Sequence, residues 1–299
     1  MNAIEIENIS KQFGKVKALD NVCLEIKQGE CFGLIGPDGA GKTTLFRILT
    51  TLLSPDNGKA SVNGFDVKRD YLEIRKCVGY MPGRFSLYQD LSVEENLEFF
   101  AALFNTKIKD SYSLIEPIYK QIEPFKTRRA GKLSGGMKQK LALCCALIHY
   151  PKVLFLDEPT TGVDAVSRSE FWDMLAGLKA KGITILVSTP YMDEASRCER
   201  IALCNEGKIL TTNTPKNIVD GYNDDLYAIS ADNMFELLSL SRKVKGVKEC
   251  YPFGESHHLV VEKDFKKDVF IKELSQIKNL QIKKTSPSIE DMFIKLMKR

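Results

Sequence analysis

The sequence lacks any apolar run long enough to cross a lipid bilayer. The longest run, residues 141–148, is far shorter than the ~20 residues that a membrane-spanning helix requires. Residues 1–7 also lack a basic stretch followed by an apolar core, so we expect no secretory signal peptide. These absences argue against an integral membrane protein and against a secreted one, and they favour a chain that works in the cytoplasm.

The sequence also lacks cysteine pairs with metal-binding spacing, and it lacks a large net charge of either sign. The eight cysteines include no C-x-x-C spacing, and Cys144 and Cys145 are adjacent within an expected helix. We therefore expect reduced, mostly buried thiols. The net charge of +4, from 43 basic and 39 acidic residues, is too small and too dispersed to indicate a nucleic-acid partner.

What remains is the composition of an ordinary globular protein, with 43% hydrophobic and 27% charged residues. A length of 299 residues allows one large domain and a small one, or two medium ones. Composition and length therefore do not indicate a function, and the sequence motifs have to be examined for one.

The most informative motif is a glycine-rich stretch at residues 36–43. It reads GPDGAGKT and matches the phosphate-loop pattern G-x-x-x-x-G-K-[ST]. Cys31–Ile35 predicts a buried strand before the loop, and residues 44–49 predict a helix after it, which is the context that phosphate binding needs. Lys42 would reach the β- and γ-phosphates, and the Thr43 hydroxyl would be a ligand of Mg²⁺. We assign nucleotide contacts to Gly36, Pro37, Asp38, Gly39, Ala40, Gly41, Lys42, Thr43 and Thr44.

Two acidic residues follow a second apolar stretch, residues 153–156. Asp157 emerges at the carboxyl end of the expected strand, the edge at which open α/β sheets bind ligands, and is the expected carboxylate for Mg²⁺. Glu158 comes next and is placed to act as general base on an attacking water. A solvated turn is the alternative interpretation of the Asp-Glu pair, and the phosphate loop argues against it.

A third motif, LSGGMKQ at residues 133–139, opens a predicted helix over residues 137–148. Ser134, Gly135 and Gly136 form a second anion-binding helix start. With these motifs the sequence resembles the ATP-binding subunits of ABC (ATP-binding cassette) transporters, in which LSGGMKQ is the signature. The resemblance covers residues 4–214, and it implies that two subunits pack head to tail, each signature covering ATP on the other subunit's phosphate loop.

The resemblance also implies a fold. We expect an α/β P-loop cassette at residues 1–217, with a mixed sheet core and a helical signature subdomain at about 84–150. Phe13 matches the aromatic residue that stacks on adenine, although it could instead be a phenylalanine of the core or of a hairpin. Residues 161–164 match the loop that bridges the two subunits.

The helical subdomain is expected to receive the coupling helix of a transmembrane permease. Ser92 and Glu95 have the capping-box spacing and open an amphipathic helix there. Four apolar residues just before that helix could form the docking surface or, equally, the core of the subdomain: Phe85, Leu87, Tyr88 and Leu91.

Two accessory groups of the family's hydrolytic site are missing. Gly83 stands where the family places a Gln that contacts Mg²⁺ and water, and Pro190 stands where the switch His is expected. Glycine and proline offer no side-chain donor or acceptor, and proline also lacks a backbone N–H. Gln89 would need a bent loop to substitute, and the three histidines, His149, His257 and His258, lie far from Pro190 in the sequence.

We therefore expect ATP and Mg²⁺ to bind and hydrolysis at this chain's own loop to be slow. Glu158 and an intact signature favour a heterodimer with a second ATP-binding subunit, and a homodimer with two slow sites stays open. The implied function is an ATPase on the inner face of the membrane that drives export through a separate permease. The alternatives are a regulatory ATP-binding module and a soluble ABC ATPase outside transport.

The sequence changes character near residues 213–215, and a second domain is expected at 221–299. The predicted order of elements is β-α-β-β-α-β, the ferredoxin-like pattern, with strands at 225–230, 247–253, 258–262 and 280–284 and helices at 233–243 and 268–278. Ser288 is expected to cap a final amphipathic helix. This ending resembles exporters of the ABC-2 type, which move drugs, antibiotics or polysaccharides, and a generic accessory domain is the alternative.

Overall fold

The computed structural model describes residues 1–298, which divide into two compact units, one ending at Pro215 and the other beginning at Lys216. Arg299, the last residue of the predicted second domain, lies outside the described residues. Within residues 1–298, no helix combines the length and the hydropathy needed to span a membrane.

A six-stranded sheet forms the centre of the first unit, in the order β10-β9-β3-β8-β7-β6. All neighbours are parallel except β10, which runs antiparallel to β9. The three central strands are buried along their whole length, as expected for apolar parallel strands covered on both faces. The strands are β3 (Cys31–Ile35), β6 (Val78–Met81), β7 (Val153–Asp157), β8 (Thr184–Thr189), β9 (Arg200–Asn205) and β10 (Lys208–Asn213).

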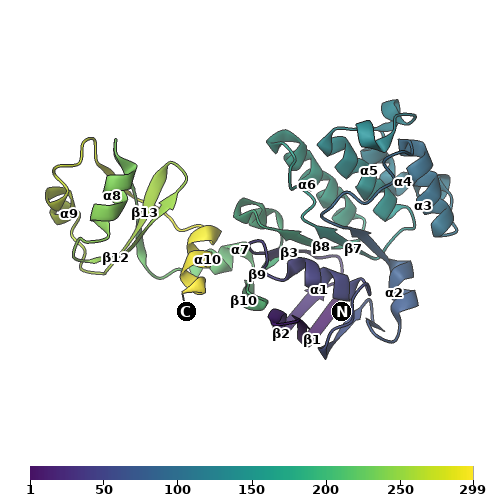
Figure 1. Ribbon diagram of the computed structural model, residues 1–299, viewed down its shortest axis with the longest axis horizontal. Coiled ribbons are helices and arrows are strands. Elements are labelled where there is room, and N and C mark those ends of the chain that lie inside the picture. The colour runs from purple at the N-terminus through teal and green to yellow at the C-terminus, as the bar shows by residue number, and fades with distance from the viewer. Residues whose placement is uncertain (299) are drawn as a thin grey trace. The chain divides into compact units, whose positions relative to one another are not determined.

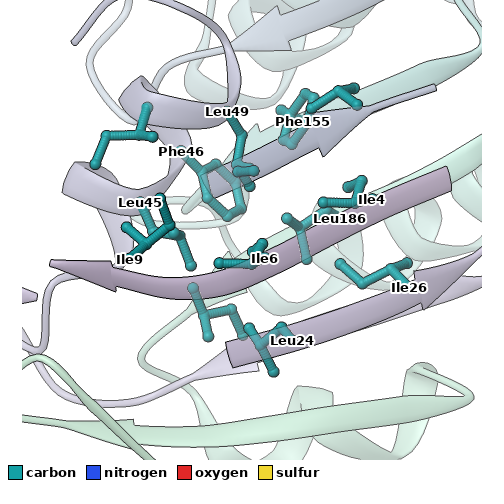
Figure 2. Close-up of a cluster of buried hydrophobic side chains, with 14 of the residues drawn as sticks. Ile4, Ile6, Ile9, Leu24, Ile26, Leu45, Phe46, Leu49, Phe155 and Leu186 are labelled. Carbon is teal, nitrogen blue, oxygen red and sulfur yellow. The ribbon is translucent and has the colours of Figure 1, made fainter. Parts of the chain in front are cut away.

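A smaller antiparallel sheet packs against the first, in the order β2-β1-β4-β5. Its strands are β1 (Asn2–Phe13), β2 (Val16–Lys27), β4 (Asn57–Val62) and β5 (Phe65–Asp66). Buried side chains of β1 and β2 face the helix α1 (Lys42–Leu49) and strands β7 and β8, as Figure 2 shows for Ile4, Ile6, Phe46 and Phe155. This shared core fixes the loop between β3 and α1, because both flanking elements are packed into it.

The remaining helices of this unit include a group formed by α3, α4 and α5, which contact one another and lie away from β1 and β2 (Figure 1). The predicted capping box is present at α3, where Ser92 and Glu95 bond reciprocally. Helix α5 begins at Gly135, two residues before the predicted start. The elements are α2 (Tyr71–Cys77), α3 (Val93–Leu103), α4 (Ile108–Tyr119), α5 (Gly135–Leu147), α6 (Ala165–Ala180) and the short 3₁₀ turns η1 (Glu123–Phe125), η2 (Ala130–Lys132) and η3 (Met192–Arg197).

The second unit has a four-stranded antiparallel sheet in the order β12-β13-β11-β14. This order, with two helices inserted, is that of a ferredoxin-like fold, so the predicted β-α-β-β-α-β pattern is confirmed. Predicted boundaries differ most at the second of these helices, which ends at Glu273, five residues early. The elements are α7 (Pro215–Asp220), β11 (Asp225–Ser230), α8 (Met234–Ser241), β12 (Val247–Phe253), β13 (Ser256–Val261), α9 (Lys267–Glu273), β14 (Gln281–Lys284) and α10 (Ile289–Met297).

The cysteines follow the prediction. All eight are free thiols, and six are buried. Burial raises the pKa of the Cys204 thiol to about 12, so this thiol stays protonated at neutral pH.

Candidate functional site

The phosphate loop connects the end of β3 to the start of α1. Gly41 has φ +97°, a left-handed conformation that glycine adopts without strain, and no side chain caps the first turn of the helix. Gly36 is equally constrained, because a Cβ there would lie 2.2 Å from the carbonyl oxygen of Cys204. The backbone N–H groups at the start of α1 are therefore left open to an anion.

Lys42 is buried inside this loop, with 4% of its surface exposed. Its Nζ donates to the carbonyl oxygens of Gly36 at 2.9 Å and Pro37 at 3.0 Å. It also forms an ion pair with Oε1 of Glu158 at 3.2 Å. The positive charge is thus held at the inner side of the loop, beside the residue predicted to act on water.

Asp157 and Glu158 stand at the carboxyl end of β7, as predicted. The Ser188 hydroxyl of β8 donates to Oδ1 of Asp157 at 2.6 Å. The backbone N–H of Glu158 contacts the carbonyl of Ser188 at 3.0 Å, and Glu158 has φ +50°, which is uncommon for a residue with a Cβ. This turn directs its side chain towards Lys42. Ser188 was missed at the sequence level, because a serine at the end of a buried strand carries no motif.

A cavity of about 430 Å³ brings most of these residues together. Asp38–Thr44 of the loop line it along with Glu158, and so do four residues that the sequence did not indicate: Val16, Lys17, Ala18 and Glu206. Phe13 does not line the cavity. It lies at the β1–β2 turn with 48% of its surface exposed, so it is not a core residue, and Nζ of Lys11 stands 5.7 Å from the centre of its ring.

The residues present fit a magnesium site of the kind completed by a substrate. Within residues 1–298, no three His, Cys, Asp or Glu side chains are grouped so that they could hold a metal ion alone. Thr43 lines the cavity, and Asp157 accepts one hydrogen bond from a side chain, which leaves acceptor capacity free. Mg²⁺ commonly takes one or two carboxylates together with phosphate oxygens.

The signature residues lie apart from this cavity. Ser134 caps α5 by accepting from the backbone N–H of Met137 at 3.3 Å, and Ser134 and Gly135 are exposed. A Cβ on Gly136 would lie 3.0 Å from the hydroxyl of Ser167, so this helix start packs closely against α6. Within one chain, the two anion-binding helix starts therefore do not share a ligand.

Position 83 is closely packed against the end of β7. A Cβ on Gly83 would lie 3.0 Å from the carbonyl oxygen of Asp157. Gln89, the possible substitute, does not line the cavity, and its carbonyl accepts from the backbone N–H of Gly131 at 2.9 Å. The loop therefore keeps Gln89 with the residues just before the signature.

Position 190 follows a hydrogen-bonded segment. The Thr189 hydroxyl donates to Oε2 of the buried Glu194 at 2.6 Å, and the backbone N–H of Gly36 donates to the carbonyl of Thr189 at 3.3 Å. None of the residues that line the cavity within 1–298 is a histidine. His149 contacts the carbonyl of Val78 instead, and the other two histidines belong to the second unit.

A larger groove of about 670 Å³ opens beside α3 and α5. Burial raises the pKa of Tyr80 there to about 12, with the charge of Asp157 adding to the effect. Burial also lowers the pKa of His149, against the opposing effect of the Val78 carbonyl. The lining includes Arg75, Lys76, Tyr80, His149 and the apolar residues Leu52, Leu72, Leu87, Phe100, Leu103 and Phe104.

The four residues predicted either for docking or for the core of the subdomain differ in burial. Leu87 is buried and lines the groove, whereas Tyr88 is 51% exposed and makes an edge-to-face contact with Phe99 at 4.8 Å. Phe85 and Leu91 are partly buried, and Nζ of Lys138 lies 5.4 Å from the ring centre of Phe85.

Comparison with known proteins gives a consistent picture. The family model described as ABC transporter matches residues 19–161. The chain is 41% identical to the probable multidrug ABC transporter ATP-binding protein YbhF of Escherichia coli (strain K12), over 91% of this chain and 48% of that protein. This chain therefore spans about half the length of that relative.

Two further matches cover nearly all of the other protein. The Nod factor export ATP-binding protein I of Rhizobium sp. (strain N33) is 35% identical, over 99% of this chain and 97% of that protein. Among solved structures, the dimeric structure of MJ0796, a bacterial ABC transporter cassette, has a TM-score of 0.64 and 26% identity, over 71% of this chain and 98% of that one.

Proposed function

This chain belongs to the ATP-binding subunits of the ABC transporter family, and we propose that it couples ATP binding and hydrolysis to export through a separate transmembrane permease. The observation that carries the proposal is the cavity in which Lys42, Thr43 and Glu158 meet at the carboxyl edge of the sheet. Export is supported by the relatives, whose names describe multidrug and Nod factor export proteins.

Each residue of the cavity has a role in this proposal. The open N–H groups at the start of α1 bind the triphosphate, and Lys42 exchanges its ion pair with Glu158 for contacts to the β- and γ-phosphates. Thr43 and Asp157 hold Mg²⁺, which neutralises charge on the phosphate oxygens when bound. Glu158, released from Lys42, accepts a proton from the attacking water. Phe13, exposed at the β1–β2 turn, stacks on adenine.

Hydrolysis at this chain's own loop is slow in our proposal. Gly83 and Pro190 supply no side chain that could orient the water or contact the γ-phosphate. Loss of such a positioning group commonly costs ~10²–10³ in rate. A Cβ at position 83 would lie 3.0 Å from the carbonyl oxygen of Asp157. This close packing supports the interpretation that the loop is built for glycine at this position.

The second half of the proposal concerns the signature. Ser134 and Gly135 are exposed at the start of α5, away from the cavity, which supports a role for Ser134, Gly135 and Gly136 on ATP held by another subunit. In a heterodimer, this chain's intact signature would complete the partner's functional site, while this chain's own slow site would bind ATP without rapid hydrolysis. A homodimer would contain two slow sites, and dimerisation as such is supported by the dimeric cassette among the solved structures.

The groove beside α3 and α5 is the proposed docking site for the permease. It is mostly apolar, its rim carries Arg75 and Lys76, and none of its lining residues within 1–298 is acidic. An amphipathic helix of the permease with an acidic residue at its edge would complement this lining. Such docking would hold the subunit on the inner face of the membrane.

The proposal is tested by measuring ATP binding and steady-state hydrolysis on the purified chain. We expect tight binding, negligible turnover, and at least a tenfold gain in turnover in the double variant Gly83→Gln with Pro190→His. Pro190→His alone serves as a second restoring variant, because a side chain at position 83 must displace the Asp157 carbonyl slightly. Lys42→Ala is the control that removes binding.

Other outcomes would change the proposal. Rapid turnover by the wild-type chain that is lost in Glu158→Gln would contradict the slow site and favour a self-sufficient homodimer. Tight binding with no turnover in any variant, alone or with a complete partner subunit, would favour a regulatory ATP-binding module, the candidate that Gly83 and Pro190 also support.

A further inference from the structure

One carboxylate in the nucleotide cavity has no part in phosphate chemistry. Glu206 lines the cavity together with the phosphate loop, yet it belongs to the β9–β10 hairpin and lies 163 to 170 positions along the chain from that loop's residues 36–43. Among residues 1–298, no hydrogen bond or ion pair engages its carboxylate. Its acceptor oxygens are therefore free.

The hairpin is fixed rigidly against the loop. The backbone N–H of Gly207 donates to the carbonyl of Ala40 at 3.1 Å, and the carbonyl of Gly207 accepts from the N–H of Asp20 at 2.8 Å. Gly207 has φ +76°, and a Cβ there would lie 2.7 Å from the carbonyl of Ala18. Glu206 itself has φ +48°. The backbone at position 206 is therefore fixed relative to the loop, and the exposed side chain of Glu206 extends from it at the edge of the cavity.

Charge decides which part of a nucleotide this carboxylate faces. A phosphate beside it would meet a like charge, whereas hydroxyl groups are donors that an acceptor-only carboxylate can bind. The triphosphate is accounted for by Lys42 and the open helix start, next to Glu158. The rest of the lining consists of residues 16–18 and Glu206. Lys17 is paired with Asp20 at 2.5 Å, so Glu206 is the charged group of this part that is unpaired within residues 1–298, and this part is left for the neutral end of the ligand.

We propose that Glu206 binds the ribose hydroxyls of the nucleotide and makes the site selective for ribonucleotides. This inference rests on the proposed ATP-binding function and adds a specificity residue to the same site. A charged hydrogen bond to a hydroxyl is worth ~1.5 kcal/mol at the low end of the usual range, which corresponds to about tenfold in affinity.

The test is a calorimetric titration of the full chain, with Mg²⁺, using ATP, 2′-deoxyATP, 3′-deoxyATP and inosine triphosphate. We expect the wild-type chain to bind ATP about tenfold more tightly than at least one of the two deoxynucleotides. In Glu206→Ala the affinity for ATP should fall to that of the deoxynucleotide, so that their ratio approaches one. Glu206→Gln, which keeps one acceptor oxygen, should give an intermediate ratio.

The control is Asp38→Asn, which alters the other unpaired carboxylate of the cavity and should change ATP and deoxynucleotide affinities alike. An unchanged ratio in Glu206→Ala with ATP still bound would overturn the ribose inference alone. Loss of discrimination against inosine triphosphate instead would assign Glu206 to the base and also overturn it. A wild-type chain that binds no nucleotide would overturn both this inference and the proposed function.

Discussion

Two aspartates, one in each unit, are both buried but are bonded very differently. Asp157 in the first unit is 2% exposed and accepts one side-chain hydrogen bond, from Ser188. Asp291 in the second unit is fully buried and accepts four hydrogen bonds. A buried charge is costly unless its acceptor positions are filled. The hydrogen bonds of Asp291 are used by the fold, whereas Asp157 keeps the acceptor capacity that our proposal assigns to Mg²⁺.

The partners of Asp291 come from distant parts of the second unit. The Tyr251 hydroxyl donates at 2.7 Å and Nδ1 of His258 donates at 2.5 Å, both to Oδ1. The backbone N–H and the hydroxyl of Ser288 each donate to Oδ2 at 2.7 Å. The His258 ring also stacks on Phe253, with 3.8 Å between ring centres. Asp291 thereby joins α10 to β12 and β13.

The largest effect is expected when the available carboxylate is neutralised. In Asp157→Asn, the Ser188 hydrogen bond can persist, so the free energy of unfolding should change by less than ~1 kcal/mol. Mg²⁺-dependent turnover, measured in the Gly83→Gln, Pro190→His background so that this chain's own site is active, should fall about a thousandfold, because several kcal/mol of charge stabilisation are lost. An unchanged dependence on Mg²⁺ would remove Asp157 from the metal site.

The saturated carboxylate should show the opposite pattern. Asp291→Ala leaves the Tyr251 hydroxyl, Nδ1 of His258 and the Ser288 hydroxyl without their acceptor, and we expect the second unit to lose about 3 kcal/mol of stability. Nucleotide affinity should stay unchanged. Urea unfolding of the full chain measures the first quantity and calorimetry the second.

The matched control for that variant lies in the same unit. Asp225 pairs with Lys284 at 2.6 Å, but both side chains are largely exposed, so Asp225→Asn should cost well under 1 kcal/mol. Equal losses in the two variants would mean that the hydrogen bonds of Asp291 do not stabilise the second unit.

Lowering the pH should reduce the stability that Asp291 provides, because its carboxylate becomes protonated. Burial by itself raises the pKa of Asp291, but the hydrogen bonds from His258, Ser288 and Tyr251 outweigh it and hold the pKa below the ordinary 3.8. The native state then binds this proton less readily than the unfolded chain. The resulting stability is present above the unfolded pKa and is lost as the pH falls through the lower, folded value. Urea midpoints from pH 6 to pH 3 should fall more steeply in the wild-type chain than in Asp291→Asn, and parallel curves would contradict this.

The same contrast explains what the sequence could predict. The phosphate loop, Asp157 and the capping box at Ser92 were predicted because their chemistry is carried by neighbouring residues. Ser188 and Glu206 were not, because each reaches the site through strand pairing across the sheet and neither belongs to a local pattern. The Asp291 network is of this second kind, since its partners lie up to 40 residues away in the chain.

The predicted start of helix α5 was wrong because of its local sequence. Helix α5 was predicted to begin at Met137, with Ser134, Gly135 and Gly136 before it. In the structure Ser134 caps the helix, and Gly135 and Gly136 form its first turn. The predicted helix start was therefore two residues late at the signature itself.

The smallest expected difference in stability concerns the two capping boxes found within residues 1–298. At α3, Ser92 bonds reciprocally with the exposed Glu95, and at α10, Ser288 bonds reciprocally with the buried Asp291. Ser92→Ala should therefore cost about 1 kcal/mol, the usual value for a lost cap. Ser288→Ala also removes a hydroxyl from a buried carboxylate, so we expect about 2 kcal/mol. Urea unfolding of both variants measures the difference. Equal costs would mean that Asp291 is satisfied without the Ser288 hydroxyl, and that the contrast between the two aspartates rests on Tyr251 and His258 alone.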